Sequence, residues 1–261
     1  MRVGKVGSML RSIKDLIGYP VEAVDGMIGK VSDCLFDDTE WGLRYLVVDA
    51  GGWMTREKVL VSPRDLIEPE VGWVRRHFPV NLSKEQIHNC PPLDADAPVS
   101  RQYEQEFAQY FQHSSYWEGA FIWGATLSPH AALPPSPEQD EAHEARMAKI
   151  AQSHLRSCRE ALGYNVAVKD GHMGELNDFI LDTQPWRLRH VVVHTSWLPG
   201  HRVLIDIDWI TEFDWSQRTA LAELTREEVK NSPKYNHHDP VNRDYEKRLY
   251  DYYGKPCYWE K

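Results

Sequence analysis

Residues 17–37 read IGYPVEAVDGMIGKVSDCLFD, and residues 162–182 read LGYNVAVKDGHMGELNDFILD. Both stretches place a Gly-Tyr pair, an Asp-Gly pair and a further Gly at the same spacing, and both end in Asp. Asp-Gly accepts the positive φ of a tight hairpin turn. Each stretch therefore predicts a β-hairpin, and the chain encodes nearly the same hairpin twice.

The similarity extends to both sides of the hairpin. LRSIKDLIGY at residue 10 pairs with LRSCREALGY at residue 155. Further pairs follow in the same order: 41–49 with 186–194, 58–66 with 202–210, 81–91 with 223–233, 98–107 with 240–249, and 116–118 with 258–260. Two long units indicate an internal duplication rather than a solenoid. We therefore expect a first domain over residues 1–119, a Pro-rich linker with a short helix over 120–153, and a second domain over 154–261.

Each copy is expected to be mainly β with appended helices. Short strands separated by Gly and Asp turns favour a small closed barrel. Capping boxes predict helical turns that begin at Ser83 and Thr225. Longer helices are expected over 101–112 and 243–253, each with four large side chains on one face. These are Tyr103, Phe107, Tyr110 and Phe111 in the first helix, and Tyr245, Leu249, Tyr252 and Tyr253 in the second.

The pattern LRS…L.GY.V…DG..G.V.D..FD…W.LRYLVVD, followed by KVLVSP..L, is similar to the PRC-barrel domain. This is the small β-barrel of the cytoplasmic part of the photosynthetic reaction-centre H subunit, and it also occurs in ribosome maturation factors and in bacterial stand-alone proteins. The similarity covers residues 10 to about 70 and 155 to about 212. It implies two PRC-type barrels, packed as a pseudo-twofold pair, and an adaptor role in docking to a membrane complex or a ribosomal protein.

Composition narrows the classes of partner. The net charge of -9 gives no long-range attraction to nucleic acid, so no nucleic-acid partner is expected. The longest apolar run is far shorter than the ~20 residues of a membrane-spanning helix, which leaves peripheral docking to a membrane complex. Four cysteines without a CxxC pair favour a reducing compartment. We expect a cytoplasmic protein without a signal peptide or cofactor, either monomer or homodimer.

Recurring aspartates are the first candidates for chemistry. They are Asp25 with Asp170, Asp33 with Asp178, and Asp37 with Asp182. Side chains two residues apart share a strand face, so these carboxylates could serve a hard cation or acid–base work. The structural alternative is strand ends and turns, which is favoured because a cation site needs more oxygen ligands.

Histidines of the second copy form a candidate metal site. The residues are His172, His190, His194 and His201. Imidazole is a common ligand of zinc and related metals. None of the four recurs in the first copy, where Tyr45 and Asp49 match His190 and His194.

Aromatic side chains are the candidate interaction surface: Trp53, Tyr103, Phe107, Tyr110, Trp197, Tyr245 and Tyr252. Tyr and Trp dominate binding hot spots, whereas the favoured structural alternative is that each helix packs its rings on its own barrel. No GxSxG, HExxH or Gly-rich phosphate loop occurs, which disfavours an enzyme. The sequence thus favours a non-enzymatic adaptor that binds another protein. The alternatives are a small-ligand or metal binder, with its site between the barrels or at the second barrel's histidines, and an enzyme without a recognisable motif.

Overall fold

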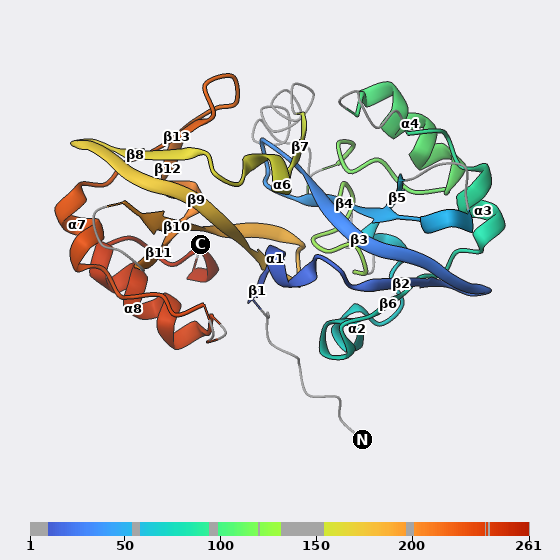
Figure 1. Ribbon diagram of the computed structural model, residues 1–261, viewed down its shortest axis with the longest axis horizontal. Coiled ribbons are helices and arrows are strands. Elements are labelled where there is room, and N and C mark those ends of the chain that lie inside the picture. Colours follow the sequence, from blue (N-terminus) through green and yellow to red (C-terminus); the bar gives the residue numbers. More distant parts are fainter. Residues whose placement is uncertain are drawn as a thin grey trace. The chain divides into compact units, whose positions relative to one another are not determined.

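The chain forms two compact units, seen in the computed structural model of Figure 1. The structure describes residues 10–53, 58–93, 99–119, 121–131, 154–196, 201–237, 239 and 241–260. We call Asp15–Arg159 with Gln184–Arg187 the N unit, and Met1–Lys14, Glu160–Thr183 and Leu188–Lys261 the C unit. Both units are therefore discontinuous in sequence. The linker expected over 120–153 lies largely outside the described residues.

The N unit is built on a six-stranded sheet of order β5-β4-β3-β2-β6, with β7 added beside β3. Its strands are β2 (Pro20–Ala23), β3 (Gly26–Asp37), β4 (Leu43–Asp49), β5 (Lys58–Val61), β6 (Phe78–Pro79) and β7 (Leu155–Ser157). The Asp-Gly turn predicted between β2 and β3 is present, with Gly26 at φ 129°. A side chain at this angle would be strained, which explains the glycine.

The C unit is built on a seven-stranded sheet of order β11-β10-β9-β8-β13-β12, with β1 added beside β9. Its strands are β1 (Leu10–Ser12), β8 (Asn165–Val168), β9 (Gly171–Asp182), β10 (Arg187–Thr195), β11 (Arg202–Asp206), β12 (Ile210–Asp214) and β13 (Thr219–Ala222). The succession β8 to β11 follows the order of β2 to β5. The predicted mainly β class is confirmed, whereas the internal duplication stays a prediction.

The closed barrels expected from the sequence are not formed by the described strands. In the C unit the sheet ends at β11 and β12, which are joined by the 3-10 turn η3 (Ile207–Trp209). In the N unit the turn η2 (Pro63–Asp65) follows β5, and a single bridge then joins Leu66 to Val80. In each turn the backbone leaves the extended conformation, so its N–H and C=O groups do not form the inter-strand hydrogen bonds that would close a barrel. Both sheets therefore remain open.

Helices flank both sheets. They are α1 (Ile13–Leu16), α2 (Pro69–Arg75), α3 (Lys84–Asn89), α4 (Arg101–Tyr110), α6 (Cys158–Ala161), α7 (Arg226–Asn231) and α8 (Arg243–Tyr253), with short 3-10 turns η1 (Gly51–Trp53) and η4 (Tyr258–Glu260). The predicted capping boxes at Ser83 and Thr225 are both present. None of the described helices has the length and apolar character needed to cross a membrane.

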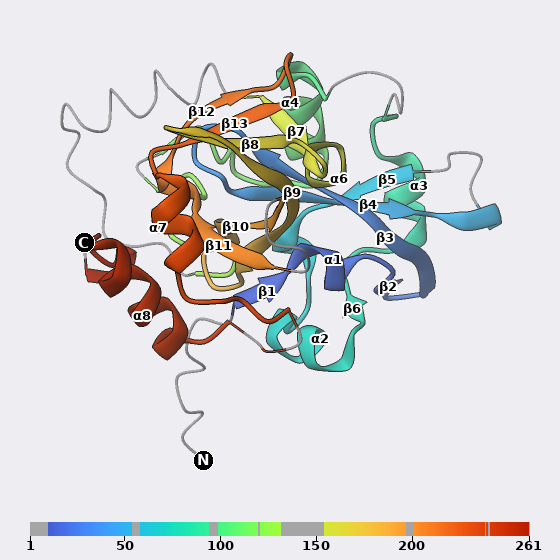
Figure 2. The same ribbon diagram turned by 60° about the vertical axis from the view of Figure 1, so that its left-hand side comes forward.

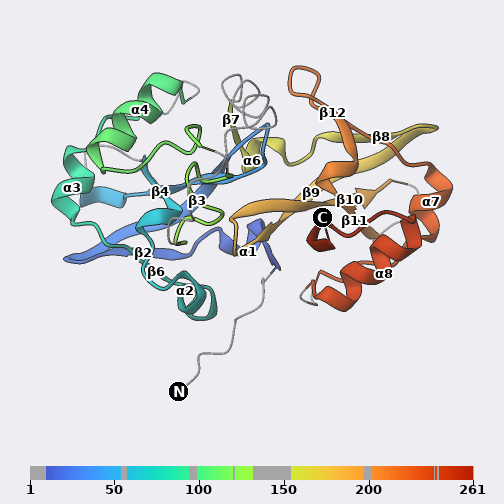
Figure 3. The same ribbon diagram turned by 180° about the vertical axis from the view of Figure 1, so that it is seen from behind.

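The long helices pack against their own unit. Figure 2 shows α7 and α8 beside the β10–β11 side of the C unit, and Figure 3 shows α3 and α4 beside β4 and β5 of the N unit. Phe107 of α4 meets Tyr45 of β4 edge to face, with ring centroids 5.2 Å apart. Tyr250 of α8 likewise meets Trp209 at 5.3 Å. Such pairs bury the aromatic faces that the helices could not expose without cost.

Each of the two LRS strands pairs with a strand from the other half of the sequence. β1 precedes the first hairpin but pairs with β9, and β7 precedes the second hairpin but pairs with β3 (Figure 1). Both pairings are antiparallel, with Ser12 opposite Ile180 and Ser157 opposite Leu35. Each unit therefore completes its sheet with a strand from the other half of the sequence.

The turn between β9 and β10 also belongs to the N unit. Its Trp186 is fully buried there, with its ring 5.9 Å from that of Trp73 and 6.5 Å from that of Phe78. The backbone carbonyl of Trp186 accepts a hydrogen bond from the N–H of Leu43 at 2.7 Å. A residue distant in sequence is thus part of the N-unit core.

Candidate functional site

Two of the recurring aspartates, Asp33 and Asp178, accept hydrogen bonds from hydroxyl and backbone N–H groups. Asp33 accepts a hydrogen bond from the Ser157 hydroxyl at 2.5 Å and from the Arg159 N–H at 3.0 Å. Asp178 accepts from the Ser12 hydroxyl at 2.5 Å and from the Lys14 N–H at 3.2 Å. These two carboxylates therefore fix the exchanged strands β7 and β1.

The Asp-Gly turns are tied to helix starts in the same manner. Asp25 accepts from the N–H of Lys84, and Asp170 from the N–H of Arg226, each at 2.8 Å. The first N–H groups of a helix have no intrahelical partners. The two carboxylates therefore accept hydrogen bonds from the first N–H groups of α3 and α7. This favours the structural interpretation of the aspartate pattern.

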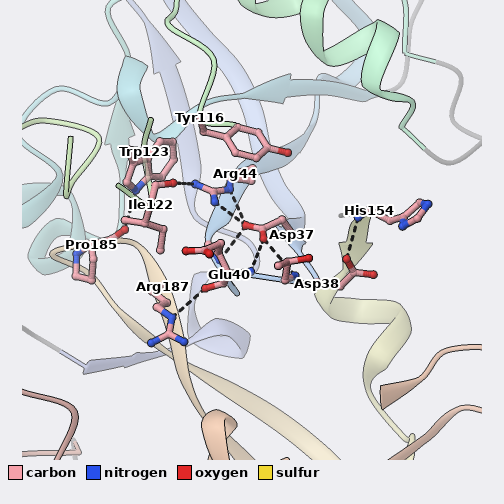
Figure 4. Close-up of polar contacts among 12 residues, drawn as sticks. Asp37, Asp38, Glu40, Arg44, Tyr116, Ile122, Trp123, His154, Pro185 and Arg187 are labelled. Atoms are coloured by element: carbon pink, nitrogen blue, oxygen red, sulfur yellow. Dashed lines mark hydrogen bonds and ion pairs between the residues drawn. The ribbon is translucent and has the colours of Figure 1, made fainter. Parts of the chain in front are cut away.

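Asp37 holds a buried arginine, as Figure 4 shows. Its carboxylate lies 2.8 Å from Nε and 2.7 Å from Nη2 of Arg44, and both side chains are fully buried. The carboxylate also accepts from the N–H groups of Glu40 at 2.6 Å and Gly42 at 3.1 Å. Arg44 donates in turn to the carbonyl of Ile122. A buried ion pair is tolerated only with such added hydrogen bonds, which here fix the guanidinium in place.

A stack of charged and aromatic groups continues from Arg44. The guanidinium carbon lies 3.9 Å from the ring centre of Tyr116, whose hydroxyl donates to Glu104 at 2.6 Å. Arg101 is 3.0 Å from Glu104 and lies 4.6 Å from the ring centre of Trp117. We call this series the N stack; its members are Asp37, Arg44, Tyr116, Glu104, Arg101 and Trp117.

The C unit contains a matching C stack: Asp182, Arg189, Tyr258, Glu246, Arg243 and Trp259. Arg189 lies 3.4 Å from Asp182 and 4.0 Å from the ring centre of Tyr258. Arg243 lies 3.1 Å from Glu246 and 3.9 Å from the ring centre of Trp259. Sequence reasoning missed both stacks, although Arg and Glu three residues apart, followed by YWE, recur in both copies.

The buried glutamates have unusual acidity. Burial raises the pKa of Glu104 to about 7, although Arg101, Tyr116 and Arg44 oppose the rise. Burial likewise raises the pKa of Glu246 to about 7, against the effect of Arg243. Each stack therefore contains a carboxyl that exchanges its proton near neutral pH.

A small pocket opens beside the N stack. It has a volume of about 290 Å³, including its open mouth. Its wall consists of the guanidinium groups of Arg44 and Arg64, several aromatic rings, and the side chains of His113 and nearby serines. Arg64 donates to the carbonyl of Ser114 at 2.5 Å, to its hydroxyl at 2.7 Å, and to the carbonyl of Trp123 at 2.8 Å. The pocket thus places two fixed cations side by side.

The histidines predicted as metal ligands are not gathered into a site. His190 is fully buried, His172 and His194 are exposed, and His201 is half-buried. Burial lowers the pKa of His190 to about 3, and its Nε2 lies 3.7 Å from Glu246. Among the residues that the structure describes, no three His, Cys, Asp or Glu side chains are placed to hold a metal ion.

The residues predicted as an interaction surface are mostly covered by their own unit. Phe107 is buried, and Tyr103 and Tyr245 are half-buried with hydroxyls that donate to the carbonyls of Pro91 and Pro233. The rings of Tyr110 and Tyr252 are exposed, and their hydroxyls donate to the carbonyls of Gln86 and Glu228. The side chains of Trp53 and Trp197 lie outside the described part of the chain.

An apolar stripe that the sequence did not reveal follows α2 in the N unit. Ile67, Val71 and Val74 are 40%, 36% and 72% exposed. Their spacing of four and three residues places Val71 and Val74 on one face of α2, with Ile67 just before the helix. The opposite face packs Trp73 into the core, where Gly72 leaves room for the ring of Phe78.

Comparison with known proteins concerns the N-terminal part of the chain. No curated protein matches the sequence. Residues 10–84 match the family model of the PRC-barrel domain, a span that runs from β1 to the first residue of α3 and covers the hairpin of β2 and β3. Residues 10–84 of this chain are therefore similar to the PRC-barrel domain.

Proposed function

We propose that the protein is a non-enzymatic interaction module, an adaptor or scaffold that binds another protein through α2. The observation that carries this proposal is the exposed stripe of Ile67, Val71 and Val74. Exposing adjacent aliphatic side chains to water is unfavourable, and apolar patches rimmed by polar groups are typical of interaction sites.

Charges around the stripe define the kind of partner. Glu68 and Glu70 are exposed where α2 begins, and Arg75 and Arg76 are exposed where it ends. A complementary protein would present an apolar strip with acidic side chains near the two arginines. The net charge of -9 opposes association of two copies by long-range repulsion, so we assign the stripe to a different polypeptide.

The partner can be captured and the interface tested with a matched pair of variants. A photo-reactive amino acid at position 74 would cross-link the partner in the host cell, and the purified partner would then be titrated against the protein. We expect Val74→Asp to raise the dissociation constant at least about tenfold, because a charge replaces buried apolar area. Val24→Asp is the control, since Val24 is 65% exposed in the turn between β2 and β3.

Equal binding by the two variants would refute α2 as the docking face. Cross-links that join only two copies of this chain would instead make the stripe a homodimer interface. Sedimentation of the purified protein distinguishes that outcome.

The proposal includes a second PRC-type module in the C unit. Its support is the shared order of β8–β11 and β2–β5 and the matching C stack. The expected pseudo-twofold pairing of the modules and the cytoplasmic location belong to the same proposal.

A further inference from the structure

We propose that the pocket beside the N stack binds a small oxyanion, such as a phosphate or a carboxylate, between Arg44 and Arg64. This proposal is independent of the docking face on α2. It rests on the charge of the pocket wall, on the rigidity of its cations and on a difference between the two units.

The wall carries more positive than negative charge. Arg44 is neutralised by Asp37, which lies behind it. Arg64 contacts two carbonyls and one hydroxyl, and none of the described residues forms an ion pair with it. The nearby carboxylate of Asp65 is engaged by His113 at 2.8 Å. The described residues that line the pocket thus include two guanidinium groups and no carboxylate, while Asp37 and Asp65 place negative charge beside the arginines.

Both cations are held in place before any ligand arrives. Arg44 lies between Asp37 and the ring of Tyr116, with the ring of Trp123 5.2 Å away. Arg64 lies 5.4 Å from the same Trp123 ring. Burial lowers the pKa of Arg64, and so does the charge of Arg44, as expected for two cations forced together. A preorganised pair of guanidinium groups is the usual protein device for recognising an oxyanion.

Polar groups beside the cations complete a set of donors. Ser114, Ser115 and His113 line the pocket together with the phenol of Tyr45. The pocket is shallow and open to solvent, so a small oxyanion would lie against the two guanidinium groups at its mouth, and a nucleotide could not be enclosed. We therefore assign the pocket to the anionic group itself.

The corresponding segment of the C unit has the opposite charge. Asp206 and Asp208 occupy the positions that match Ser62 and Arg64 in the aligned segments 58–66 and 202–210. The C unit keeps its stack but replaces the second arginine with a carboxylate. Both units have a stack, but Asp208 stands where the N unit has Arg64. We therefore assign the stack a structural role and Arg64 the binding role.

Calorimetric titration of the full chain with inorganic phosphate and, separately, with acetate tests the proposal at constant ionic strength. We expect one site per chain, and the two titrations distinguish a tetrahedral oxyanion from a carboxylate. Arg64→Gln should weaken binding at least about tenfold, since it removes a charge-assisted contact. Arg64→Lys should retain part of the affinity.

Arg248→Gln is the matched control, because it removes an exposed arginine from α8 of the C unit. Circular dichroism shows whether the Arg64 variants keep their fold. The proposal is overturned by the absence of saturable binding to the unaltered protein. It is also overturned when a folded Arg64→Gln binds the anion as tightly as the unaltered protein, or when Arg248→Gln weakens binding as much as Arg64→Gln does.

Discussion

Buried charges dominate the molecule at the scale of single residues. Asp37 and Arg44 are fully buried and linked by two contacts shorter than 3 Å, whereas Asp182 and Arg189 are 3.4 Å apart. Removing a charge from water is costly. Loss of either partner should therefore destabilise the protein more for Asp37 and Arg44, the shorter and more buried pair. The N stack and the C stack therefore contain the same residue types, but the ion pair should contribute more to the stability of the N stack.

Removal of the arginine should reveal that difference. We expect Arg44→Gln to lower the free energy of unfolding by about 3–5 kcal/mol, because Asp37 is left buried without its counter-ion. Arg189→Gln should cost clearly less, since its ion pair is longer and its side chain is 15% exposed. Urea unfolding of both variants provides the comparison, and equal losses would contradict it.

Glu246 makes stability depend on pH. Burial raises its pKa from 4.5 to about 7, so the folded state binds the proton more tightly than the unfolded state. The stability linked to that proton is complete below about pH 4.5 and is lost as the pH rises toward 7. The shift corresponds to about 3 kcal/mol at most.

A neutral isostere should remove this dependence. Relative to the unaltered protein, Glu246→Gln is expected to become progressively more stable between pH 5 and 8, by up to about 3 kcal/mol. Thermal unfolding across this range measures the effect, with exposed Glu212→Gln as the control. A constant difference at every pH would show that Glu246 stays ionised in the folded protein.

Strand exchange is the main feature at the scale of elements. β1 and β7 are three residues long, and each is fixed to its sheet by one aspartate in addition to the ladder. Asp178 accepts hydrogen bonds from both ends of the β1–α1 junction, and Asp33 does the same for β7 and α6. Such short strands would otherwise detach easily, since few contacts hold them.

Crossed variants can test these attachments. Asp178→Ala should lower hydrogen-exchange protection of Leu10–Ser12 at least about tenfold, because the strand loses its side-chain anchor. Protection of Leu155–Ser157 should stay unchanged in that variant, whereas Asp33→Ala should have the reverse effect. Loss of protection in the same strand from either variant would show that the anchors do not act separately.

At the scale of the whole molecule, the sequence predicted what local signals encode. The Asp-Gly turn at Gly26 and the capping boxes at Ser83 and Thr225 depend on neighbouring residues, and the structure contains all three. The closed barrel was not formed, because Ser62 and Asp206 cap 3-10 turns at the place of closure. The alternation of residues along the strands does not predict that one side chain will cap a 3-10 turn at these positions.

Contacts between residues far apart in the sequence could not be predicted from the sequence patterns. No local feature of LRS indicates that it pairs with a strand from the other half of the chain. The N stack joins β4, α4 and the loop that contains Tyr116, so it depends on tertiary packing. His190 and His194 share a strand periodicity, yet only His190 lies under the helix that carries Glu246, while His194 lies near the strand end. From the sequence, the two stacks could therefore be seen only as residue types that recur at matching positions, not as side chains in contact.

Exchange of β1 and β7 has a consequence for protein synthesis. A ribosome that has produced the first copy has not yet made Ser157, so the nascent N unit lacks β7 and leaves that edge of β3 open. Meanwhile β1 has emerged but must wait for β9. The N-unit sheet cannot be completed until Leu155–Ser157 has been made, and the C-unit sheet not until β8–β13 have followed. During that interval two β edges are exposed to chaperones or to neighbouring nascent chains.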